Sequence, residues 1–369
     1  MFIGIFVPFI NNFGKEGYYN SQEIGLAKAL AKKKHEIIIY KLTKEKITSI
    51  QKEIEKNVYI KYVSAKALGS NGIIRFNHLD KKINVLICFS DLQLIVPSIY
   101  VWCKKNHILF LPYIGVLESH SNNFILKKIM DFLSYRNIRI YKKCHSLVKN
   151  KKVYEILKNY DFDKITLVPV GVDLDKMNMN YKHENITKLK IKYGYKEEDR
   201  IVLFIGRLDC EKNPIDLIRY FEKVYKIDNS YRLLIVGEGI LQDEVEKEIS
   251  RRKLENVVKQ IKKMPNTEIW ELYRISECFI NLNKQEIFGM AILESMYYET
   301  KTIAWHAPGP DLIIENNVSG YLVNNENELF EKISIQNESV KENAHKRIVE
   351  CFTWDRTAKE INNIIQNYI

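Results

Sequence analysis

The chain has 369 residues, more than one hydrophobic core usually supports, so two domains are expected. Its hydrophobic fraction of 46% and charged fraction of 28% exclude a disordered or collagen-like protein. The formal net charge of +11 is unevenly placed, because residues 1–170 hold 28 Lys and Arg against 13 Asp and Glu, whereas the remainder holds 29 against 33.

The basic first half indicates an anionic partner. Nucleic acid, an anionic membrane surface and a phosphorylated lipid all fit, and so do solvated helix faces of a Lys-rich protein. No nucleic-acid reading motif is present, so nucleic acid is not expected. None of the six cysteines forms a Cys-x-x-Cys pair, which is typical of reduced thiols in a cytosolic protein.

The N-terminal residues Met1–Ile10 are apolar but lack a basic leader, so no secretory signal is expected. The longest apolar stretch, Ile83–Trp102, contains Asp91, Gln93 and Pro97, which makes it a poor spanning helix. Membrane contact would therefore be peripheral, on the inner face.

In chain order, the first half alternates short apolar runs with helical patterns, which predicts an α/β fold with a buried parallel sheet. Strands are expected at Phe2–Phe9, Glu36–Tyr40, Val85–Phe89, Ile108–Pro112, Ser146–Val148 and Thr166–Val170, and helices at Ser21–Lys34 and Asn122–Lys143. The polar segment Asp173–Asp199 is typical of a linker into a second domain.

The pattern then restarts in the second half. Strands are expected at Ile201–Ile205, Arg232–Val236, Val257–Ile261, Cys278–Leu282, Thr302–Trp305 and Gly320–Val323, and helices at Pro214–Tyr225, Leu241–Arg252, Thr267–Ile275, Met290–Tyr298 and about Trp354–Tyr368. Ligands of such doubly wound sheets bind at the carboxyl ends of the strands.

Four motifs follow one another in this half: Gly206-Arg207-Leu208 with Glu211-Lys212, Val236-Gly237-Glu238-Gly239, Glu286-x7-Glu294, and Gly309 followed by Gly320–Val323. In order and spacing the chain resembles the family 4 retaining glycosyltransferases of the bacterial polysaccharide type. The resemblance implies the GT-B fold: two doubly wound Rossmann-like α/β domains facing a cleft. Residues 1–172 would bind the acceptor, with the last helix, about 354–369, crossing back, and residues 173–353 would bind a nucleotide-sugar donor.

Two basic residues are placed to meet the donor diphosphate. Arg207 follows a strand directly and Lys212 lies a few residues later, so both would project from one strand end. Charge-assisted contacts to phosphate are about twice as strong as neutral ones. Two surface bases on a loop are the alternative, and the order of the motifs favours phosphate binding.

Glu286 and Glu294 flank Phe288-Gly289-Met290, where Gly289 permits close backbone approach before a helix whose N-terminus suits a phosphate. By resemblance, Glu286 contacts donor sugar hydroxyls and Glu294 the ribose. Acids favourably placed near a helix N-terminus are the alternative.

The pair Gly237-Glu-Gly239 lacks the third glycine of a dinucleotide fingerprint, because Gln242 stands there, and this argues against NAD. By resemblance Gly237 belongs to a turn beside the nucleotide, and the stretch from Ile261 contacts the base. The short Asp-x-Asp at Asp173-Leu-Asp175 resembles a metal motif of a different fold, and no catalytic metal or cofactor is predicted.

In the first half the family's paired glycine is loosened to Gly14-Lys-Glu-Gly17, of which Gly17 is favoured. The family's histidine after a strand is absent at Tyr113-Ile114-Gly115, and His120 is the candidate substitute, a solvated loop histidine being the alternative. Lys149-Asn150 and Lys284 replace serines that the family often has.

The stretch Asn122–Lys143 combines aromatic, aliphatic and basic residues, a composition typical of an interfacial helix. A core-facing helix with a basic outer face is the alternative. We expect a helix that packs on the first domain and touches an anionic membrane with its basic edge.

The predicted activity is hexosyl transfer from a nucleoside diphosphate sugar, with a UDP-sugar favoured, to a saccharide or lipid-linked saccharide in surface polysaccharide synthesis. Arg207, Lys212, Glu286 and His120 are the candidate catalytic residues. The expected protein is a monomer or weak dimer. A nucleotide-sugar epimerase or phosphorylase of the same fold and a non-enzymatic basic binding module are the alternatives.

Overall fold

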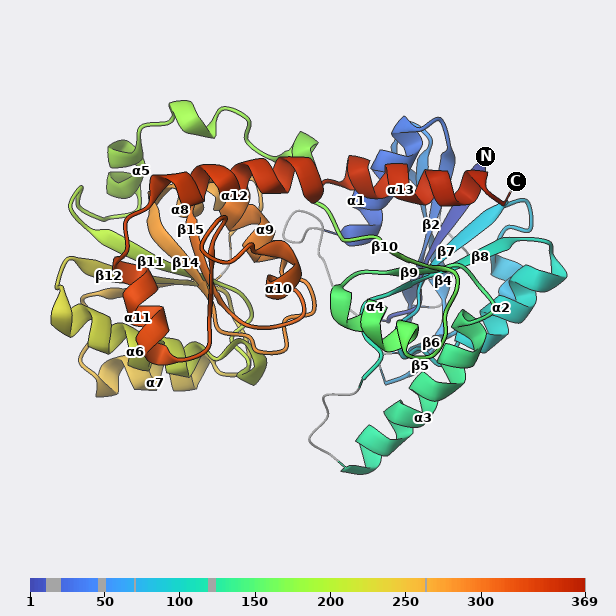
Figure 1. The fold of residues 1–369 in the computed structure, drawn as a ribbon, viewed down its shortest axis with the longest axis horizontal. Coiled ribbons are helices and arrows are strands. Elements are labelled where there is room, and N and C mark those ends of the chain that lie inside the picture. The colour runs from blue at the N-terminus through green and yellow to red at the C-terminus, as the bar shows by residue number, and fades with distance from the viewer. Residues whose placement is uncertain (11–20, 46–50, 70, 119–123, 263, 369) are drawn as a thin grey trace. The chain divides into compact units, whose positions relative to one another are not determined.

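The computed structural model describes residues 1–10, 21–45, 51–69, 71–118, 124–262 and 264–368 (Figure 1). The chain divides into two compact units. Unit 1 contains the described residues up to Gly171 together with those from Trp354 onward, and unit 2 contains Val172–Thr353. The first boundary therefore falls one residue before the sequence boundary at 172/173, and the return point falls where the sequence places the last helix.

Unit 1 is built on an eight-stranded sheet in the order β10-β9-β8-β7-β1-β2-β4-β3. Its pairings are parallel except that of β3 with β4. The strands are β1 (Phe2–Val7), β2 (Glu36–Thr43), β3 (Gln51–Glu55), β4 (Val58–Ser64), β7 (Val85–Phe89), β8 (Leu109–Ile114), β9 (Ser146–Val148) and β10 (Ile165–Leu167). A separate antiparallel pair joins β5 (Lys66–Leu68) and β6 (Asn71–Ile73).

Helices cover both faces of this sheet. They are α1 (Gln22–Lys32), α2 (Val96–Lys105), α3 (Phe124–Tyr141), α4 (Lys151–Lys158) and α13 (Trp354–Gln366), with the short helix η1 (Phe76–His78). The apolar side of α2 packs into the cluster that includes Phe6, Ile38 and Tyr40. The other face receives α1, and α13 lies along α1 (Figure 1).

The return of the last helix to unit 1 is fixed by two polar contacts. His35 Nε2 lies 2.8 Å from Asn362 Oδ1, and Thr357 Oγ1 donates to the Pro169 carbonyl at 2.7 Å. The alanine and isoleucines on the inner side of α13 are fully buried or nearly so. The C-terminal helix is therefore an integral part of unit 1.

Unit 2 has an all-parallel, six-stranded sheet in the order β13-β12-β11-β14-β15-β16. The strands are β11 (Arg200–Ile205), β12 (Tyr231–Val236), β13 (Val258–Ile261), β14 (Ser276–Asn281), β15 (Lys301–Trp305) and β16 (Tyr321–Val323). Numbered within the unit this order is 3-2-1-4-5-6, the doubly wound order, with its switch point between β11 and β14.

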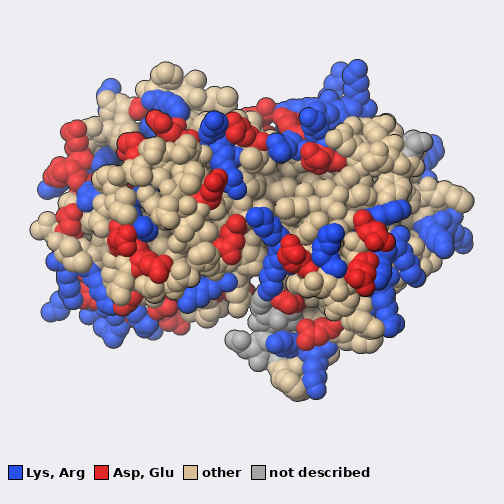
Figure 2. Space-filling model, viewed as in Figure 1, with Lys and Arg blue, Asp and Glu red and all other residues tan. Residues whose placement is uncertain are grey.

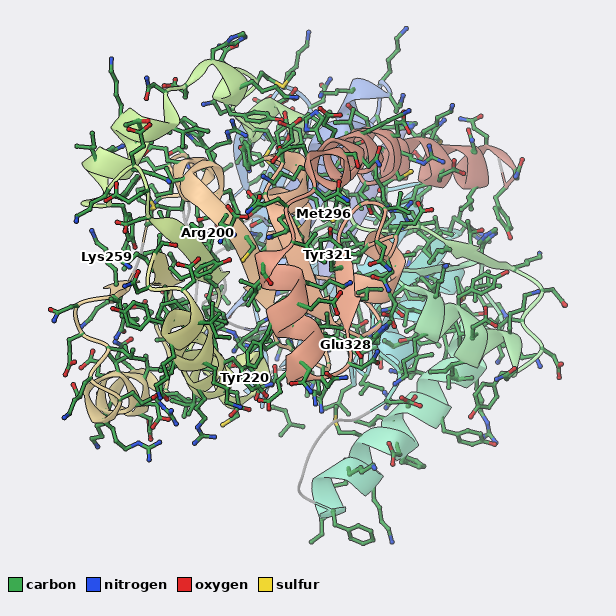
Figure 3. The ribbon with its side chains drawn as sticks, turned by 60° about the vertical axis from the view of Figure 1, so that its left-hand side comes forward. Arg200, Tyr220, Lys259, Met296, Tyr321 and Glu328 are labelled. Atoms are coloured by element: carbon green, nitrogen blue, oxygen red, sulfur yellow. The ribbon has the colours of Figure 1, made fainter. Side chains whose placement is uncertain are left out.

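The helices of unit 2 lie on the two sides of its sheet (Figure 1). One layer packs apolar residues of α6, α7 and α11 onto the sheet, and the other contains α8, α9 and α12. Met296 of α9 and Tyr321 of β16, labelled in Figure 3, are both buried. The bounds are α5 (Ile186–Lys192), α6 (Pro214–Ile227), α7 (Gln242–Arg251), α8 (Ile269–Ile275), α9 (Met290–Tyr297), α10 (Pro310–Ile313), α11 (Glu326–Ser334) and α12 (Glu338–Cys351), with η2 (Leu174–Lys176), η3 (Tyr181–His183) and η4 (Cys210–Lys212).

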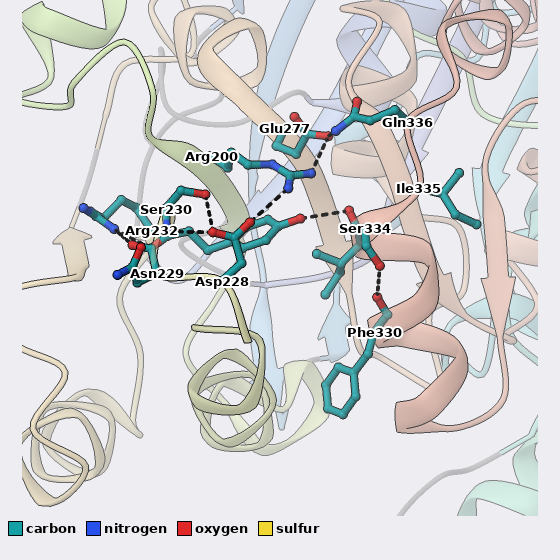
Figure 4. A network of polar contacts seen from close by, with 12 residues as sticks. Arg200, Asp228, Asn229, Ser230, Arg232, Glu277, Phe330, Ser334, Ile335 and Gln336 are labelled. Carbon is teal, nitrogen blue, oxygen red and sulfur yellow. Dashed lines mark hydrogen bonds and ion pairs between the residues drawn. The ribbon is translucent and has the colours of Figure 1, made fainter. Parts of the chain in front are cut away.

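A polar network ties the amino ends of the unit 2 strands together (Figure 4). Arg200 Nη1 donates to Asp228 Oδ2 at 3.2 Å, and its Nη2 lies 3.7 Å from Glu277 Oε1. Lys301, 1% exposed, pairs with Glu277 at 3.2 Å and donates to two backbone carbonyls at the end of α11 at 2.7 Å each. The network holds β11, β12, β14 and β15 at the edge opposite to their carboxyl ends.

The segment 173–199 differs from its predicted role as a linker. It carries η2, η3 and α5 and is part of unit 2. Lys192 Nζ and Tyr193 Oη both donate to the Glu271 carboxylate, at 2.5 and 2.6 Å. Its polar residues thus make specific contacts with α8, which a composition-based reading does not distinguish from solvation. Among the described residues no helix is both long and apolar enough to cross a membrane.

Candidate active site

The predicted site residues of unit 2 gather where β11 and β14 end side by side. The two strands are neighbours in the sheet, and the strand order reverses between them. Loops that leave adjacent strands on opposite sides of such a switch point form a crevice at the carboxyl edge. The loop after β11 carries Arg207 and leads to Lys212, and the loop after β14 carries Glu286.

Lys212 and Glu286 form the central contact of this edge. Lys212 Nζ donates to Glu286 Oε2 at 2.5 Å, and the two side chains are 21% and 13% exposed. Asn281, the last residue of β14, donates from Nδ2 to the same carboxylate oxygen at 3.1 Å. Partial burial strengthens an ion pair relative to one in open water. The structure therefore brings two predicted residues together, 74 positions apart in the sequence.

Lys212 owes its position to the turn that carries it. Asp209 caps η4 by accepting from the Lys212 backbone N–H at 3.2 Å. Asn213 follows with a φ of 52° and donates from Nδ2 to the Leu282 carbonyl at 2.9 Å, so it joins the β11 loop to the β14 loop. Pro214 then begins α6 with the fixed φ suited to a first helical position.

Arg207 is held by acids of its own loop. Its Nη2 lies 3.0 Å from Asp209 Oδ2 and 3.7 Å from Glu211 Oε2, and its side chain is 52% exposed. The guanidinium is thus oriented yet open to solvent. A planar cation of this kind can bind a phosphate through two parallel hydrogen bonds.

The loop from Glu286 to α9 is a tight backbone structure. Gly309 donates its N–H to the Glu286 carbonyl at 2.8 Å, and the ring of Phe288 is buried against Phe352. Gly289 stands at the N-cap of α9 with a φ of 102°, which side chains rarely adopt, so glycine is required there. Met290 is the first residue of the helix, as predicted. The N-terminus of α9 therefore opens beside Glu286.

Glu294 lies one turn into α9 and is 8% exposed. Tyr273 Oη donates to Glu294 Oε2 at 3.0 Å. Burial, together with the neighbouring Glu294 carboxylate, raises the pKa of Tyr273 far above its usual range, so the phenol stays protonated as a donor. Tyr273 was not predicted as a site residue, because nothing in the sequence pattern links α8 to α9.

Gly237 and Ile261 lie at the ends of β12 and β13. The Gly237 N–H donates to the Ile261 carbonyl at 2.9 Å. A Cβ at Gly237 would lie 1.8 Å from the Gly206 carbonyl oxygen, and its φ is 143°. The loops after β11 and β12 approach this closely only because residue 237 is glycine, which agrees with the predicted turn.

Only some of the predicted site residues of unit 1 lie in the part of the chain that the structure describes. Gly14, Gly17 and His120 lie outside the described residues. Lys149 follows β9 and is buried, with its ammonium 4.5 Å from the Phe89 ring centroid and 4.8 Å from that of Tyr113. Asn150 caps α4 by accepting from the Val153 N–H at 2.9 Å, the task a serine could perform there.

The arrangement in unit 2 combines two cations, a helix N-terminus and two carboxylates at one sheet edge. The cations and the helix N-terminus suit an anionic group such as a diphosphate, and carboxylates accept hydrogen bonds from hydroxyls. Lys284 differs, because its exposed side chain stacks over Trp305 at 5.1 Å from the ring centroid. Within the described ranges no group of three or more His, Cys, Asp or Glu side chains is placed to hold a metal ion.

The region that holds these residues is similar to known proteins. Residues 185–347 match the family model described as glycosyl transferases group 1. The chain is 23% identical over 241 residues to the alpha-monoglucosyldiacylglycerol synthase of Acholeplasma laidlawii, a match that covers 64% of this chain and 60% of that enzyme. It thus spans less than two thirds of that relative's length.

Solved structures agree over the whole chain. A sucrose-phosphate synthase from Thermosynechococcus elongatus superposes with a TM-score of 0.78 at 15% identity, covering 100% of this chain and 98% of that one. Anabaena HepE in complex with UDP-glucose gives 0.74 at 14% identity, covering 99% of both chains. At such identities the likeness shows the fold. Residues 185–347 thus carry the match to the glycosyl transferases group 1 model, and the chain has the GT-B fold.

Proposed function

We propose that the chain is a hexosyltransferase that uses a nucleoside diphosphate sugar. The observation that carries this proposal is the contact of Lys212 with Glu286 at the switch point, with the guanidinium of Arg207 on the same loop. A diphosphate needs cations, and a hexose needs hydrogen-bond acceptors for its hydroxyls. Here a cation, Lys212, and an acceptor, Glu286, are joined by a direct hydrogen bond.

A UDP-sugar is the proposed donor. The fold neighbours include Anabaena HepE solved with UDP-glucose and Staphylococcus aureus TarM solved with UDP. In this proposal the diphosphate lies on Arg207, Lys212 and the N-terminus of α9. Glu294 accepts from the ribose hydroxyls, and the base lies beside Ile261.

The reaction we propose proceeds with retention at the anomeric carbon. The bond from that carbon to the β-phosphate oxygen breaks, the acceptor oxygen bonds to the carbon, and the acceptor proton passes to the departing diphosphate. Lys212 and Arg207 offset the negative charge that develops on the leaving group, a role in which fixed charges are most effective. Glu286 holds the hexose by its hydroxyls.

The acceptor we propose is a saccharide carried on a lipid, met at the anionic inner surface of a membrane during surface polysaccharide synthesis. Two relatives are named alpha-monoglucosyldiacylglycerol synthase, from Acholeplasma laidlawii and Streptococcus pneumoniae, and such a product is a glycolipid. The excess of basic residues in positions 1–170 supports an anionic acceptor or surface.

A donor panel tests the proposal first. UDP-, GDP- and ADP-sugars are added singly to the protein and thermal unfolding is recorded, since a ligand that binds only the folded state raises its stability. Transfer is then measured with the sugar that gives the largest shift, with and without a crude lipid extract, and the anomeric configuration of the first product is read by NMR.

The outcomes separate the competing activities. Transfer to a lipid fraction with retention supports the proposal. Epimerised sugar formed from the donor alone would identify an epimerase, and sugar phosphate formed in the presence of inorganic phosphate would identify a phosphorylase. A donor-induced shift without any turnover would identify a binding module.

A further inference from the structure

The helix α3 has one side packed on unit 1. The residues that face inward recur every three or four positions, as expected of one helix face. These buried residues are Leu133, Ser134, Asn137, Ile138 and Tyr141. All of them lie in the second half of the helix, so that half carries the packing.

Polar contacts fix this second half firmly. Asn137 Nδ2 donates to the Gln93 carbonyl at 2.9 Å, and Tyr141 Oη donates to the Asp91 carbonyl at 2.5 Å. Ser134 Oγ donates to a backbone carbonyl in the loop after β8 at 2.6 Å. Since these donors are buried and bonded to backbone, the orientation of α3 on unit 1 is well defined.

The opposite side of α3 exposes large apolar side chains. Phe124, Ile125 and Phe132 are 69%, 70% and 66% exposed, and Ile129 and Tyr135 are about half exposed. At 100° per residue these five side chains centre roughly 180° from the packed face. In Figure 3 the first turns of α3 carry their side chains away from the rest of unit 1. The helix therefore has a second apolar face that the described part of unit 1 does not cover.

Basic residues accompany this outer face. Lys128 Nζ lies 4.5 Å from the Phe124 ring centroid, and Arg139 Cζ lies 4.4 Å from that of Tyr135. Lys127 is also exposed, but at 100° per residue it lies on the side of the packed residues, and Asp131 is the single acidic residue of the helix. Figure 2 shows uncharged surface next to Lys and Arg side chains at this end of the molecule. Long apolar groups interleaved with lysine and arginine suit the boundary between lipid headgroups and acyl chains.

We propose that the outer face of α3 docks on an anionic lipid bilayer, with Phe124, Ile125, Ile129 and Phe132 entering the headgroup boundary and Lys128 and Arg139 meeting lipid phosphates. This inference rests on the proposed function only in that a lipid-borne acceptor would be reached at such a surface. A bilayer is favoured over a protein groove because the face is convex, continues over about three turns and is flanked by Lys128 and Arg139. The membrane contact thus rests chiefly on apolar side chains, with the basic edge in support.

Vesicle binding tests the docking face. The full chain is floated with vesicles of phosphatidylcholine alone and of phosphatidylcholine with phosphatidylglycerol. The variant F124S/I125S/F132S is expected to bind vesicles about 100-fold more weakly than the parent. Each of the three replaced side chains would otherwise gain free energy by leaving water for the headgroup boundary. K128Q/R139Q is expected to lose about fivefold per basic residue, on anionic vesicles only. The matched control I227S/I240S removes two exposed isoleucines of unit 2, which are 80% and 82% exposed, and should bind as the parent does.

Donor binding is measured by the UDP-sugar thermal shift on the same proteins. This measurement distinguishes failure of the docking proposal from failure of the proposed function. A protein that binds donor but not vesicles overturns the docking proposal alone. A protein that binds vesicles through α3 but shows no donor shift overturns the proposed function alone. A dimer that dissociates in F124S/I125S/F132S, combined with no vesicle binding by the parent, would assign the face to a second copy of the chain and overturn the lipid assignment.

Discussion

Replacement of Lys212 by methionine removes the charge at the centre of the site while keeping the length of the side chain. The lost interaction is a contact of 2.5 Å to Glu286, whose carboxylate retains Asn281 at 3.1 Å. Because both side chains of the pair are only partly buried, the expected loss of folding stability is about 1–2 kcal/mol. For a unit of this size that lowers Tm by about 2–8 °C and leaves the protein folded at 25 °C.

The effect on turnover should be much larger. Removal of one fixed group that stabilises developing negative charge typically lowers kcat by about 100- to 1000-fold, or about 2.7–4 kcal/mol. We therefore expect K212M to fall into this range, with a small change in KM for the donor. K212R should recover part of kcat, since it restores the charge with a different geometry.

Donor turnover with saturating acceptor and urea unfolding of the same preparations measure the two quantities. The matched control is K223M, which removes an exposed lysine of α6 that pairs with Glu326 at 3.0 Å, and it should retain full activity. A K212M enzyme with kcat within threefold of the parent would refute the assignment of Lys212 to the leaving group. Loss of activity in K223M as well would point to a general effect of charge.

Three further changes probe the rest of unit 2. Gly237→Ala should cost about 2–4 kcal/mol in unfolding free energy, because the added Cβ would meet a backbone carbonyl at 1.8 Å. Tyr273→Phe should raise the donor KM about tenfold with little change in kcat, since the phenol orients the Glu294 carboxylate. Lys301→Met should cost about 3 kcal/mol by leaving Glu277 without its buried cation. Burial alone would raise the pKa of Glu277, but the charges of Lys301 and Arg200 and the hydrogen bonds from Gln336 and Lys301 outweigh burial and hold the pKa below its ordinary value of 4.5. The parent should therefore lose stability as pH falls below about 4.5, and this loss should shrink in the variant when unfolding is compared between pH 3 and 6.

The parallel sheets could be predicted from sequence because buried strands are continuous apolar runs. Val85–Phe89 and Ser146–Val148 agree with the structure to the residue. The strands β3 to β6 were missed. Gln51–Glu55 lies on a sheet edge and is mostly polar and exposed, and β5 and β6 have three residues each. Val58–Ser64 lies inside the sheet with Val58, Ile60 and Val63 buried, so its alternation was present in the sequence and was overlooked. The helix α12 was missed for a similar reason, since only three of its fourteen residues are buried. Secondary structure that gains its stability from an edge or from a narrow contact leaves little hydrophobic pattern.

Residues of the candidate site could be predicted where the charge of the side chain and its place after a strand suggest its role. Arg207, Lys212 and Glu286 follow strand ends, and neighbouring parallel strands bring their carboxyl ends to one edge of the sheet. Asn281 and Tyr273 were not predicted, because their roles depend on which loop or helix lies opposite. A hydrogen-bond partner that is set by tertiary packing has no local signature in the sequence, and it becomes clear only in the folded structure.

The distribution of charge along the chain indicates which of the two proposed substrates the excess of basic residues would serve. If the donor diphosphate accounted for the basic character of the chain, the excess of Lys and Arg would lie in the donor-binding half. It lies in residues 1–170, while the remainder is slightly acidic. The proposed donor site would need few cations, because Lys212 and Arg207 are held by neighbouring acids and would act on the diphosphate at short range. A diffuse excess of basic residues attracts anions over about a Debye length, so it suits an extended anionic surface. The exposed apolar side of α3 lies in that same basic half, so charge and hydrophobicity point to one partner, a lipid bilayer.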